Sequence, residues 1–393
     1  MTEAAADSPI PVRSIALLSG AAFCSAATLR IADPLLPQVA EEFAAGVSDA
    51  AIIATGFTLA YGLCQLVHGP IGDQFGKYGV ITLMTFLSAL TTATAALSPS
   101  LFVLGTLRFV SGATAAALIP LSMAYIGDVV PYDRRQPVLA RFMSGQILGV
   151  IGGQVAGGLF GEFLGWRGVF VALAAVYLAF ALLLALELRS PRVVQTRTPF
   201  SVGGLVSTFL ALGRSARVRL VLATVFVEGM LFFGGFTYLG AFLRHEYGLG
   251  YAAIGGVLSA FGGGALVYAL AAPRIVAALG QRNMVAAGGA ALAAGFAVFA
   301  LQPPWPALVP GVALCGLGFY LFHNTLQTQA TQMAPHARGI AVSVFASCLF
   351  LGQAAGIALA GPLAEALGYA AVFVGAGVLL LLLALVFRRR LTP

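Results

Sequence analysis

Five ionisable side chains interrupt long apolar stretches of this sequence. Glu228 lies in the segment VFVEGMLF, with no cation within one helical turn. Arg30 and Asp33 are three positions apart, and Arg108 and His323 each interrupt a separate apolar run. Because an ionisable group at bilayer depth costs ~2.5–3.5 kcal/mol on insertion scales, such residues are functional candidates by default. The chemistry open to them is proton transfer and the recognition of charge.

Glu228 is the leading candidate for reversible protonation. An unpaired carboxylate in an apolar setting is destabilised in its charged form, so it can bind and release a proton near neutral pH. The alternative is a carboxylate held by an arginine of another helix. His323 can relay protons, or it can simply form a hydrogen bond to a neighbouring helix. Gln327, four residues later, shares its helical face.

Arg30 and Asp33 share a helical face at i, i+3 spacing. They form either a structural ion pair or a proton or substrate site, and the sequence leaves both open. Arg108 keeps its charge at any physiological pH, so it can bind Asp33, Glu228 or an anionic substrate.

The composition shows what kind of element holds these residues. The chain of 393 residues is 60% hydrophobic and 9% charged, with a mean hydropathy of +0.95. These values predict an integral membrane protein and exclude a soluble domain of this length. The four cysteines all fall in apolar segments, so they are expected to be small buried residues and neither disulfides nor metal ligands.

Nucleotide-binding, zinc and serine-hydrolase motifs are absent from the sequence. We therefore expect neither an enzyme nor an ATP-driven pump, and neither a metal nor a cofactor, the energy source being a proton gradient. The short polar N-terminus is followed by an apolar span of about 25 residues without a cleavage pattern, so a removable signal peptide is not expected.

Twelve apolar spans are long enough to cross a hydrocarbon core, which takes ~20 residues. The longest connection, 189–217, is rich in Arg, Ser, Thr and Pro, and it is the predicted linker between an N-terminal six-helix bundle (1–188) and a C-terminal one (218–393). The predicted spans are 14–39, 49–71, 78–97, 100–125, 136–161, 167–188, 218–243, 252–274, 283–301, 306–331, 338–362 and 369–387.

The basic residues fall almost entirely on one side of these spans. Of the 21 Arg and Lys residues, Arg30 and Arg108 lie within spans, Arg167 and Arg244 flank one side, and the other 17 flank the opposite side. The positive-inside rule then predicts that both termini and the linker are cytoplasmic, in a bacterial-type inner membrane. We therefore attribute the net charge of +7 to residues that set the orientation in the membrane and contact anionic lipid. Nucleic acid is not an expected partner.

A shift of 203 positions superimposes the two halves of the chain. The fifth span then corresponds to the eleventh, and both have the same orientation because six spans separate them. This is a parallel repeat about an axis along the membrane normal, a transporter architecture with its site at the repeat interface. Equivalent pairs are Gly149 and Gly352, Gly153 and Gly356, Gly158 and Gly361, Glu162 and Glu365, and Gly165 and Gly368.

The fifth span is unusually rich in glycine. Gly145, Gly149, Gly153 and Gly157 recur at i, i+4 spacing, with Gly158 beside them. In lipid such a face persists as helix and lets another helix approach closely. We expect a sliding surface at the seam between the halves.

Two further segments carry recognisable motifs. The loop between the second and third spans reads GPIGDQFGK from Gly69 to Lys77, and the fourth span carries Arg108 and Gly112 four residues apart. These segments are similar to the G-x-x-x-D-R-x-G-R loop and the R-x-x-x-G pattern of the major facilitator superfamily.

The glycine run from Gly149 to Gly158 resembles the antiporter motif of the same family, with Gln154 at the position of its proline. With the Gly165-Trp166-Arg167 start of the sixth span, these motifs extend the resemblance over the whole chain. The chain most resembles the 12-span drug/proton antiporter branch. The lost proline weakens the antiporter motif, since a proline kink belongs to it.

The resemblance implies roles for particular residues. It implies that Asp73 docks onto the eleventh span and locks an outward-facing state, while Arg108 takes part in proton coupling. It also implies that spans 1, 4, 7 and 10, which carry the intramembrane charges, line one cavity. The loop chemistry independently allows Lys77 to pair with Asp128. The expected gating residues are Gly69, Asp73, Gly76, Lys77, Asp128, Gly149, Gly153, Gly157 and Gly158.

The expected function is proton-coupled efflux, by antiport, of small lipophilic or amphiphilic compounds. The alternatives are a permease or exporter for one polar metabolite, such as a sugar or organic anion, and a receptor without transport activity. We expect a monomer whose partners are substrate, protons and lipid. The expected proton-coupling residues are Glu228, Asp33, Arg108 and His323, and the expected substrate-binding residues are Arg30, Tyr61, Gln65, Phe232, Phe236, Tyr238, Asn324 and Gln327.

Overall fold

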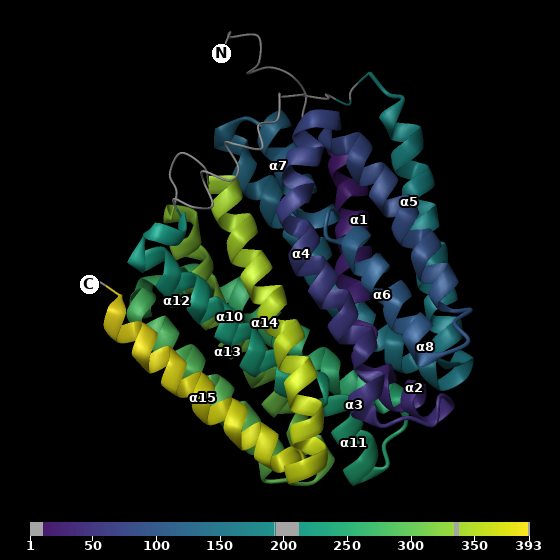
Figure 1. Cartoon of the computed structure of the whole chain (residues 1–393). Helices are drawn as coiled ribbons and strands as arrows, with labels where there is room; N and C mark the ends of the chain where they lie inside the picture. Colours follow the sequence, from purple (N-terminus) through teal and green to yellow (C-terminus); the bar gives the residue numbers. More distant parts are fainter. Residues whose placement is uncertain (1–10, 192, 194–211, 334–337, 392–393) are drawn as a thin grey trace.

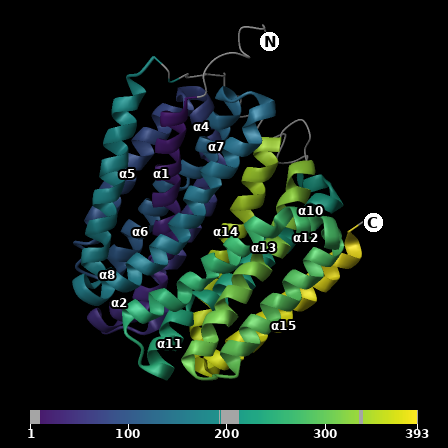
Figure 2. The ribbon, with the colours of Figure 1, turned by 180° about the vertical axis from the view of Figure 1, so that it is seen from behind.

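The computed structural model describes residues 11–191, 193, 212–333 and 338–391, and every regular element in these ranges is a helix (Figure 1). Most of the predicted linker, 194–211 with Arg192, lies outside the described residues. The helices stand side by side as a bundle, with the first half of the chain on one side and the second half on the other (Figures 1 and 2).

The first half supplies six spans. The first is α1 (Val12–Arg30), η2 (Asp33–Leu35) and α2 (Leu36–Glu42); the second is α3 (Val47–Ala50) and α4 (Ile52–Phe75); the third is α5 (Lys77–Ala95); the fourth is α6 (Leu101–Ala115) and α7 (Leu118–Val129); the fifth and sixth are α8 (Tyr132–Leu188).

The second half follows the same plan. Its elements are α10 (Ala216–Thr237) and α11 (Leu239–Tyr247), α12 (Tyr251–Ala300), η3 (Trp305–Ala307) and α13 (Leu308–Gln332), α14 (Arg338–Leu367) and α15 (Tyr369–Arg390).

Two of these helices each contain two spans. The backbone of α8 leaves helical geometry at Gly165 (φ 69°) and that of α12 at Gly280 (φ 65°), conformations that favour glycine. Ten helices of the described chain are long and apolar enough to cross a membrane. Division of α8 and α12 at these glycines gives twelve spans, as predicted from the sequence.

Each half has its own apolar core. One core gathers buried residues mainly from 15–184, and the other gathers residues from 221–391. The second is dense in aromatic rings, with Phe232 in contact with Phe233, Phe236, Phe261, Phe296 and Phe319. The two cores are the physical basis of the two bundles.

The 203-residue repeat holds in three dimensions. A Cβ atom added to Gly149 would run into the carbonyl of Phe23 on α1, and one added to Gly352 would run into that of Phe226 on α10. Both members of the second contact are 203 positions beyond those of the first. One turn further along, Gly153 meets Ala27 and Gly356 meets Met230, again 203 apart.

These contacts correct the expected position of the sliding surface. The i, i+4 glycines of α8 pack against α1 of their own half, because the absent side chains let the two backbones touch. The seam with the other half is made by the neighbouring face, where Gly158 meets Tyr251 and Gly255 of α12. The i, i+4 glycines therefore hold α8 against α1 within the N-terminal half, and the adjacent face of α8 contacts the C-terminal half.

Candidate functional site

Glu228 and His323 form a hydrogen-bonded pair inside the C-terminal half. His323 Nδ1 on α13 lies 2.9 Å from Glu228 Oε2 on α10, and the two side chains are 12% and 0% exposed. Glu228 Oε1 has no hydrogen-bond partner among the described residues. The sequence left two possibilities, an isolated carboxylate or one held by an arginine of another helix. The structure shows neither, because the partner of Glu228 is a histidine three spans further along the chain.

The histidine ring is held in place by aromatic neighbours. It stacks on Phe319 with 4.9 Å between ring centroids and an interplanar angle of 9°, and it lies 5.3 Å from the ring of Phe345 on α14. A carboxylate and an imidazole in hydrogen-bond contact each have an atom that can accept a proton. The free oxygen of Glu228 is the position at which such a proton can reside.

Arg30 and Asp33 form a second buried pair, where α1 ends and the η2 turn begins. Arg30 Nη1 lies 3.5 Å from Asp33 Oδ2, and both side chains are less than 5% exposed. Pro34 has no N–H to continue the α1 ladder, which explains the break in the helix here.

Arg30 also reaches the other half of the molecule. Its Nη2 donates to Gln353 Oε1 on α14 at 3.4 Å, and its guanidinium lies 4.1 Å from the centroid of the Phe233 ring on α10. Arg30 is therefore a contact between the halves as well as half of an ion pair. Gln353 was not selected from the sequence, since a glutamine in an apolar helix carries no charge anomaly.

Aromatic rings connect the two pairs. Phe233 under Arg30 contacts Phe319 at 5.4 Å between centroids, and Phe319 carries the stacked His323. A continuous series of side-chain contacts therefore runs from Arg30 at the seam to the buried Glu228.

Arg108 is bound to backbone carbonyls rather than to a carboxylate. Its Nε donates to the carbonyl of Ile53 at 3.2 Å and its Nη2 to that of Thr28 at 3.0 Å, while the Phe57 ring lies 4.4 Å away. Among the described residues it forms no ion pair with Asp33 or Glu228, contrary to one sequence expectation. A cation here stabilises the carbonyls near the end of α1 and fixes that end against α4.

Three of the expected substrate-binding side chains are buried, Phe232 and Phe236 in the C-terminal core and Tyr238 at the seam, against the N-terminal core. Phe232 and Phe236 are 0% and 1% exposed and stack at 5.3 Å between centroids. Tyr238 is 1% exposed and donates to the carbonyl of Ile357 at 2.8 Å. In this conformation they are core residues: the two phenylalanines pack against rings of α12 and α13, and Tyr238 packs against α14.

The other expected binding residues, Tyr61, Gln65, Asn324 and Gln327, carry polar groups and are buried or half-buried. Tyr61 shares a hydrogen bond with Ser25 at 3.3 Å and lies 4.4 Å from the Phe350 ring across the seam. Gln65 is buried, and its Oε1 has no partner among the described residues. Asn324 and Gln327 are half-buried on α13, next to His323.

The loop between α4 and α5 forms an ion-pair cluster at the basic face, the end of the bundle where α1 begins and α15 ends. Lys77 Nζ lies 2.7 Å from Asp73 Oδ1 and 2.8 Å from Asp128 Oδ2 on α7. The expected Lys77–Asp128 pair is present, and Gly76 turns the chain with a φ of 96°. The Asp73 carboxylate is 46% exposed and paired within its own half. Gly69 has open space around its Cα.

In the part of the chain that the structure describes, polar contacts between the halves lie away from that face. Where both partners are described, they join Arg30 to Gln353, Ser347 to the carbonyl of Gly62, Glu41 to Tyr251 and Arg244, and Glu162 to the N–H of Ala252. Most of these residues lie at the opposite face, the end of the bundle with α2, α3 and α11 (Figure 1). The molecule is closed at that face.

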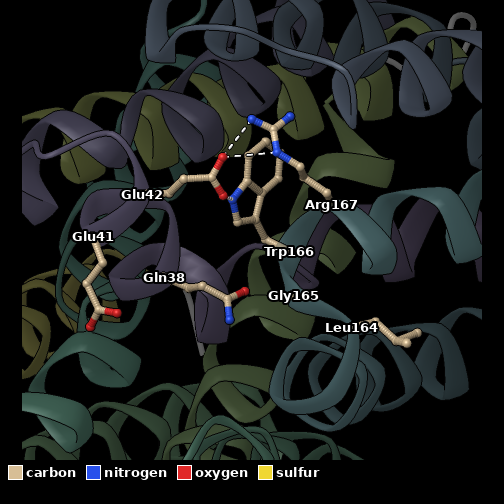
Figure 3. Close-up of a pocket in the computed structure, with 7 residues that line it drawn as sticks. All are labelled: Gln38, Glu41, Glu42, Leu164, Gly165, Trp166 and Arg167. Atoms are coloured by element: carbon tan, nitrogen blue, oxygen red, sulfur yellow. Dashed lines mark hydrogen bonds and ion pairs between the residues drawn. The ribbon is translucent and has the colours of Figure 1, made fainter.

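A shallow cavity of about 480 Å³ lies at the rim of the opposite face (Figure 3). Within it Glu42 accepts hydrogen bonds from Trp166 Nε1 at 2.5 Å and from Arg167 Nη2 at 2.6 Å, while Glu41 points away from this cluster (Figure 3). Its lining residues are Gln38, Glu41, Glu42, Leu164, Gly165, Trp166 and Arg167.

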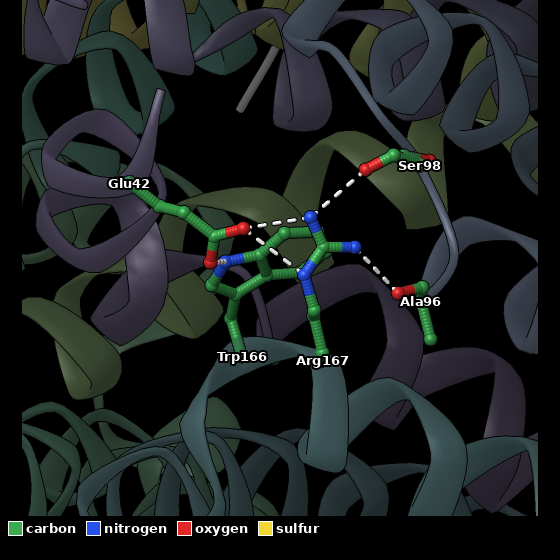
Figure 4. Close-up of polar contacts among 5 residues, drawn as sticks. All are labelled: Glu42, Ala96, Ser98, Trp166 and Arg167. Atoms are coloured by element: carbon green, nitrogen blue, oxygen red, sulfur yellow. Dashed lines mark hydrogen bonds and ion pairs between the residues drawn. The ribbon is translucent and has the colours of Figure 1, made fainter. Parts of the chain in front are cut away.

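Arg167 also donates to the carbonyls of Ala96 and Ser98 at 2.7 and 2.9 Å (Figure 4). The cluster therefore ties the start of the sixth span to the end of the first and to the hairpin between the third and fourth. The charges of Glu42 and Arg167 are thus paired within the N-terminal half, and this part of the cavity wall is structural.

Comparison with known proteins agrees with this architecture. The model of the Major Facilitator Superfamily matches residues 18–357 and 257–393, and the chain belongs to that family. It is 27% identical over 368 residues to the uncharacterised MFS-type transporter YwfA of Bacillus subtilis (strain 168), covering 91% of this chain and 87% of that protein. It is 24% identical over 338 residues to YceJ, an uncharacterised MFS-type transporter of the same organism, covering 84% and 83%.

Solved structures share the fold. The nucleoside transporter NupG superimposes with a TM-score of 0.78 at 16% identity, over 96% of this chain and 99% of that one. A POT family transporter in complex with 5-aminolevulinic acid gives a TM-score of 0.76 at 16% identity, over 95% of each chain. The protein is thus a multi-pass membrane transporter of this superfamily.

Proposed function

We propose that the protein is a proton-coupled antiporter that exports small lipophilic or amphiphilic compounds by alternating access. The observation that carries the proposal is the Glu228–His323 pair, a titratable unit with a free carboxylate oxygen in the middle of a membrane span. A buried ionisable pair of this kind is costly to maintain and is expected to serve proton transfer.

The path from this pair to the seam gives the proton a way to influence the conformation. A proton taken up by Glu228 and His323 changes the charge beside Phe319, and Phe319 contacts the Phe233 ring that supports Arg30. Arg30 holds Gln353 across the seam. Asp33, the partner of Arg30, is the second proton site in this scheme, and Arg108 acts through the carbonyl of Thr28 by fixing the end of α1.

The substrate class follows from the chemistry at the centre of the molecule. Tyr61, Gln65, Asn324 and Gln327 offer few polar groups among many apolar ones. Such a lining suits compounds that bind mainly by apolar contact. Phe232, Phe236 and Tyr238 would contact substrate only in a conformation that exposes them.

A second candidate is the transport of an organic anion. Arg30 supports it, because its contacts to Asp33 and Gln353 are long, at 3.5 and 3.4 Å, and a carboxylate ligand would bind the same guanidinium more closely. The fold neighbour MFSD10 is described as a human organic anion transporter, at a TM-score of 0.72 and 17% identity over 96% of this chain and 99% of that one.

We place the protein in a bacterial-type inner membrane as a monomer, with the basic face, both termini and the linker in the cytoplasm. The 17-to-2 distribution of flanking basic residues supports this orientation. The closed opposite face is then external, and the structure corresponds to a state closed to the outside.

Transport in proteoliposomes tests the proposal. With an acidic lumen, antiport predicts that a fluorescent lipophilic cation accumulates inside, while an organic anion accumulates if the second candidate is correct. Glu228→Gln should lose the dependence on the pH gradient, and Glu246→Gln, an exposed acid paired with the adjacent His245, should keep it. Accumulation that is independent of pH, or a full gradient response in Glu228→Gln, would refute proton coupling through this residue.

A further inference from the structure

Glu162, at the end of the fifth span, reaches across the seam to the start of the eighth. Its Oε2 accepts the backbone N–H of Ala252 in the first turn of α12 at 3.2 Å. The N-cap of α12 is Gly250, which has no side chain to satisfy that turn. A Cβ atom added to Gly250 would lie 3.0 Å from Glu162 Oε2. The helix is thus capped by a carboxylate from the other half of the molecule.

On the other side of the seam the repeat-related residues also lie together. Glu365, at the end of the eleventh span, faces Gly46, the N-cap of α3 at the start of the second span. A Cβ atom added to Gly46 would lie 3.0 Å from Glu365 Oε1. The two glutamates are 203 positions apart and the two glycines 204, and both glycines are extended, with φ, ψ of −67°, 154° and −65°, 157°.

Simple electrostatics makes both contacts attractive. The first N–H groups of a helix have no intrahelical acceptor, and the helix dipole places partial positive charge there. A serine or aspartate at the N-cap would satisfy these groups from within the same half. With glycine at both caps, the groups are left for a carboxylate of the other half, and the contact can form only while the opposite face is closed.

We propose that Glu162 and Glu365 are paired latch residues, which hold the opposite face closed by capping helices of the other half. The two latches are related by the repeat, so the face is held on both sides of the central axis. The inference rests on the alternating access of the proposed function, but it is independent of proton coupling and of substrate.

The two latches differ in strength. Asp49 lies in the first turn of α3, and its Oδ2 would be 3.6 Å from a Cβ at Gly46. This second carboxylate repels Glu365 and already neutralises part of the helix charge. Near Gly250, the neighbouring Tyr251 and Arg244 bind Glu41 of the N-terminal half and add to closure. The Glu162 latch is therefore the stronger one.

Spin-label distances across the opposite face test the proposal directly. Leu97 and Leu301 are suitable sites, because they are 78% and 80% exposed in equivalent hairpins of the two halves. The full-length protein, with its four cysteines replaced, carries cysteine labels at both sites and is measured in lipid nanodiscs without substrate or pH gradient. Glu162→Gln and Glu365→Gln should each raise the ratio of long to short distances about two- to fivefold, with the larger effect for Glu162. The double variant should multiply the two effects.

Controls separate the latch from general damage. Glu246→Gln removes an acid on the same face that crosses no seam, and it should leave the distances unchanged. Because a glutamine can still accept the N–H of Ala252, Glu162→Ala and Glu365→Ala form a second set, expected to show larger shifts. Unchanged distances in both sets would overturn the proposal. Because the readout is conformational, that result is separate from the Glu228→Gln transport assay that tests proton coupling.

Discussion

The histidine beside Glu228 decides how much the buried acid costs the protein. Removal of one member of a buried, hydrogen-bonded pair leaves the other with its full desolvation penalty. In His323 and Glu228 that penalty would fall on a carboxylate with no exposed surface. The cost should therefore appear in stability as well as in transport.

His323→Ala is expected to lower the stability of the protein by about 1–3 kcal/mol and to abolish gradient-driven transport. Thermal unfolding in detergent, followed by the tryptophan signal, gives the first quantity, and the proteoliposome assay gives the second. Thr328→Ala, on the same helix but exposed and bonded only to a carbonyl of that helix, is the matched control. A variant as stable as the parent would mean that the pair is not energetically coupled.

Arg108 provides a test of geometry at constant charge. Its guanidinium donates to two carbonyls on different helices, and a lysine ammonium is a point charge without a fixed fork. Arg108→Lys should keep expression and lose most transport, about tenfold or more, because the end of α1 is no longer fixed. Wild-type transport in Arg108→Lys would show that positive charge alone suffices there.

At the scale of elements, glycine contacts set the distance between helices. Gly149 and Gly352 each press on the carbonyl of the equivalent residue, Phe23 or Phe226. An added methyl group has no space and must push α1 from α8, or α10 from α14. Overpacking of this kind costs about 1–3 kcal/mol.

Gly149→Ala and Gly352→Ala should therefore destabilise the protein to a similar extent, measured by thermal unfolding. Gly256→Ala is the matched control on α12, since nothing lies within 4 Å of the position of its Cβ. If Gly256→Ala were as damaging as Gly149→Ala, the effect would come from helix propensity or lipid contact and not from the close approach of the backbones.

The sequence predicts helices better than it predicts their contacts. Apolar length places all twelve spans, because the bilayer allows few other structures. The repeat of Gly149 and Gly352 is also visible from spacing. Which face of α8 meets α1 and which meets α12 is not, because in lipid both faces are apolar and the hydrophobic pattern no longer distinguishes them.

The site residues show the same limit. Ionisable residues within apolar spans are easily recognised, because lipid makes each of them costly. This criterion identifies Glu228, His323, Arg30 and Asp33. It does not tell that Glu228 pairs with His323, which depends on the relative rotation of α10 and α13. It also misses Gln353 and the cross-seam role of Glu162, whose repeat partner Glu365 was nevertheless visible in the sequence.

At the scale of the whole molecule, the Asp73 loop makes its ion pair within its own half while the opposite face is closed. Asp73 is bound to Lys77 in its own half, and the resemblance assigns it to the eleventh span in the outward-facing state. Asp73→Ala should then destabilise only that second state. It is expected to abolish transport while expression and thermal stability stay intact. Full transport by Asp73→Ala, measured in proteoliposomes, would remove the loop from the mechanism.

The contact of Arg30 with Phe233 shows where the pseudo-two-fold axis passes through the molecule. These two residues are 203 positions apart, so each occupies in its own half the place that the other occupies in its half. In a two-fold arrangement, equivalent residues touch only at the rotation axis. An undiverged duplicate would bring two arginines or two phenylalanines together there. One cation facing one ring turns that self-contact into an attraction, and it places the Arg30 guanidinium on the pseudo-two-fold axis that relates the two halves.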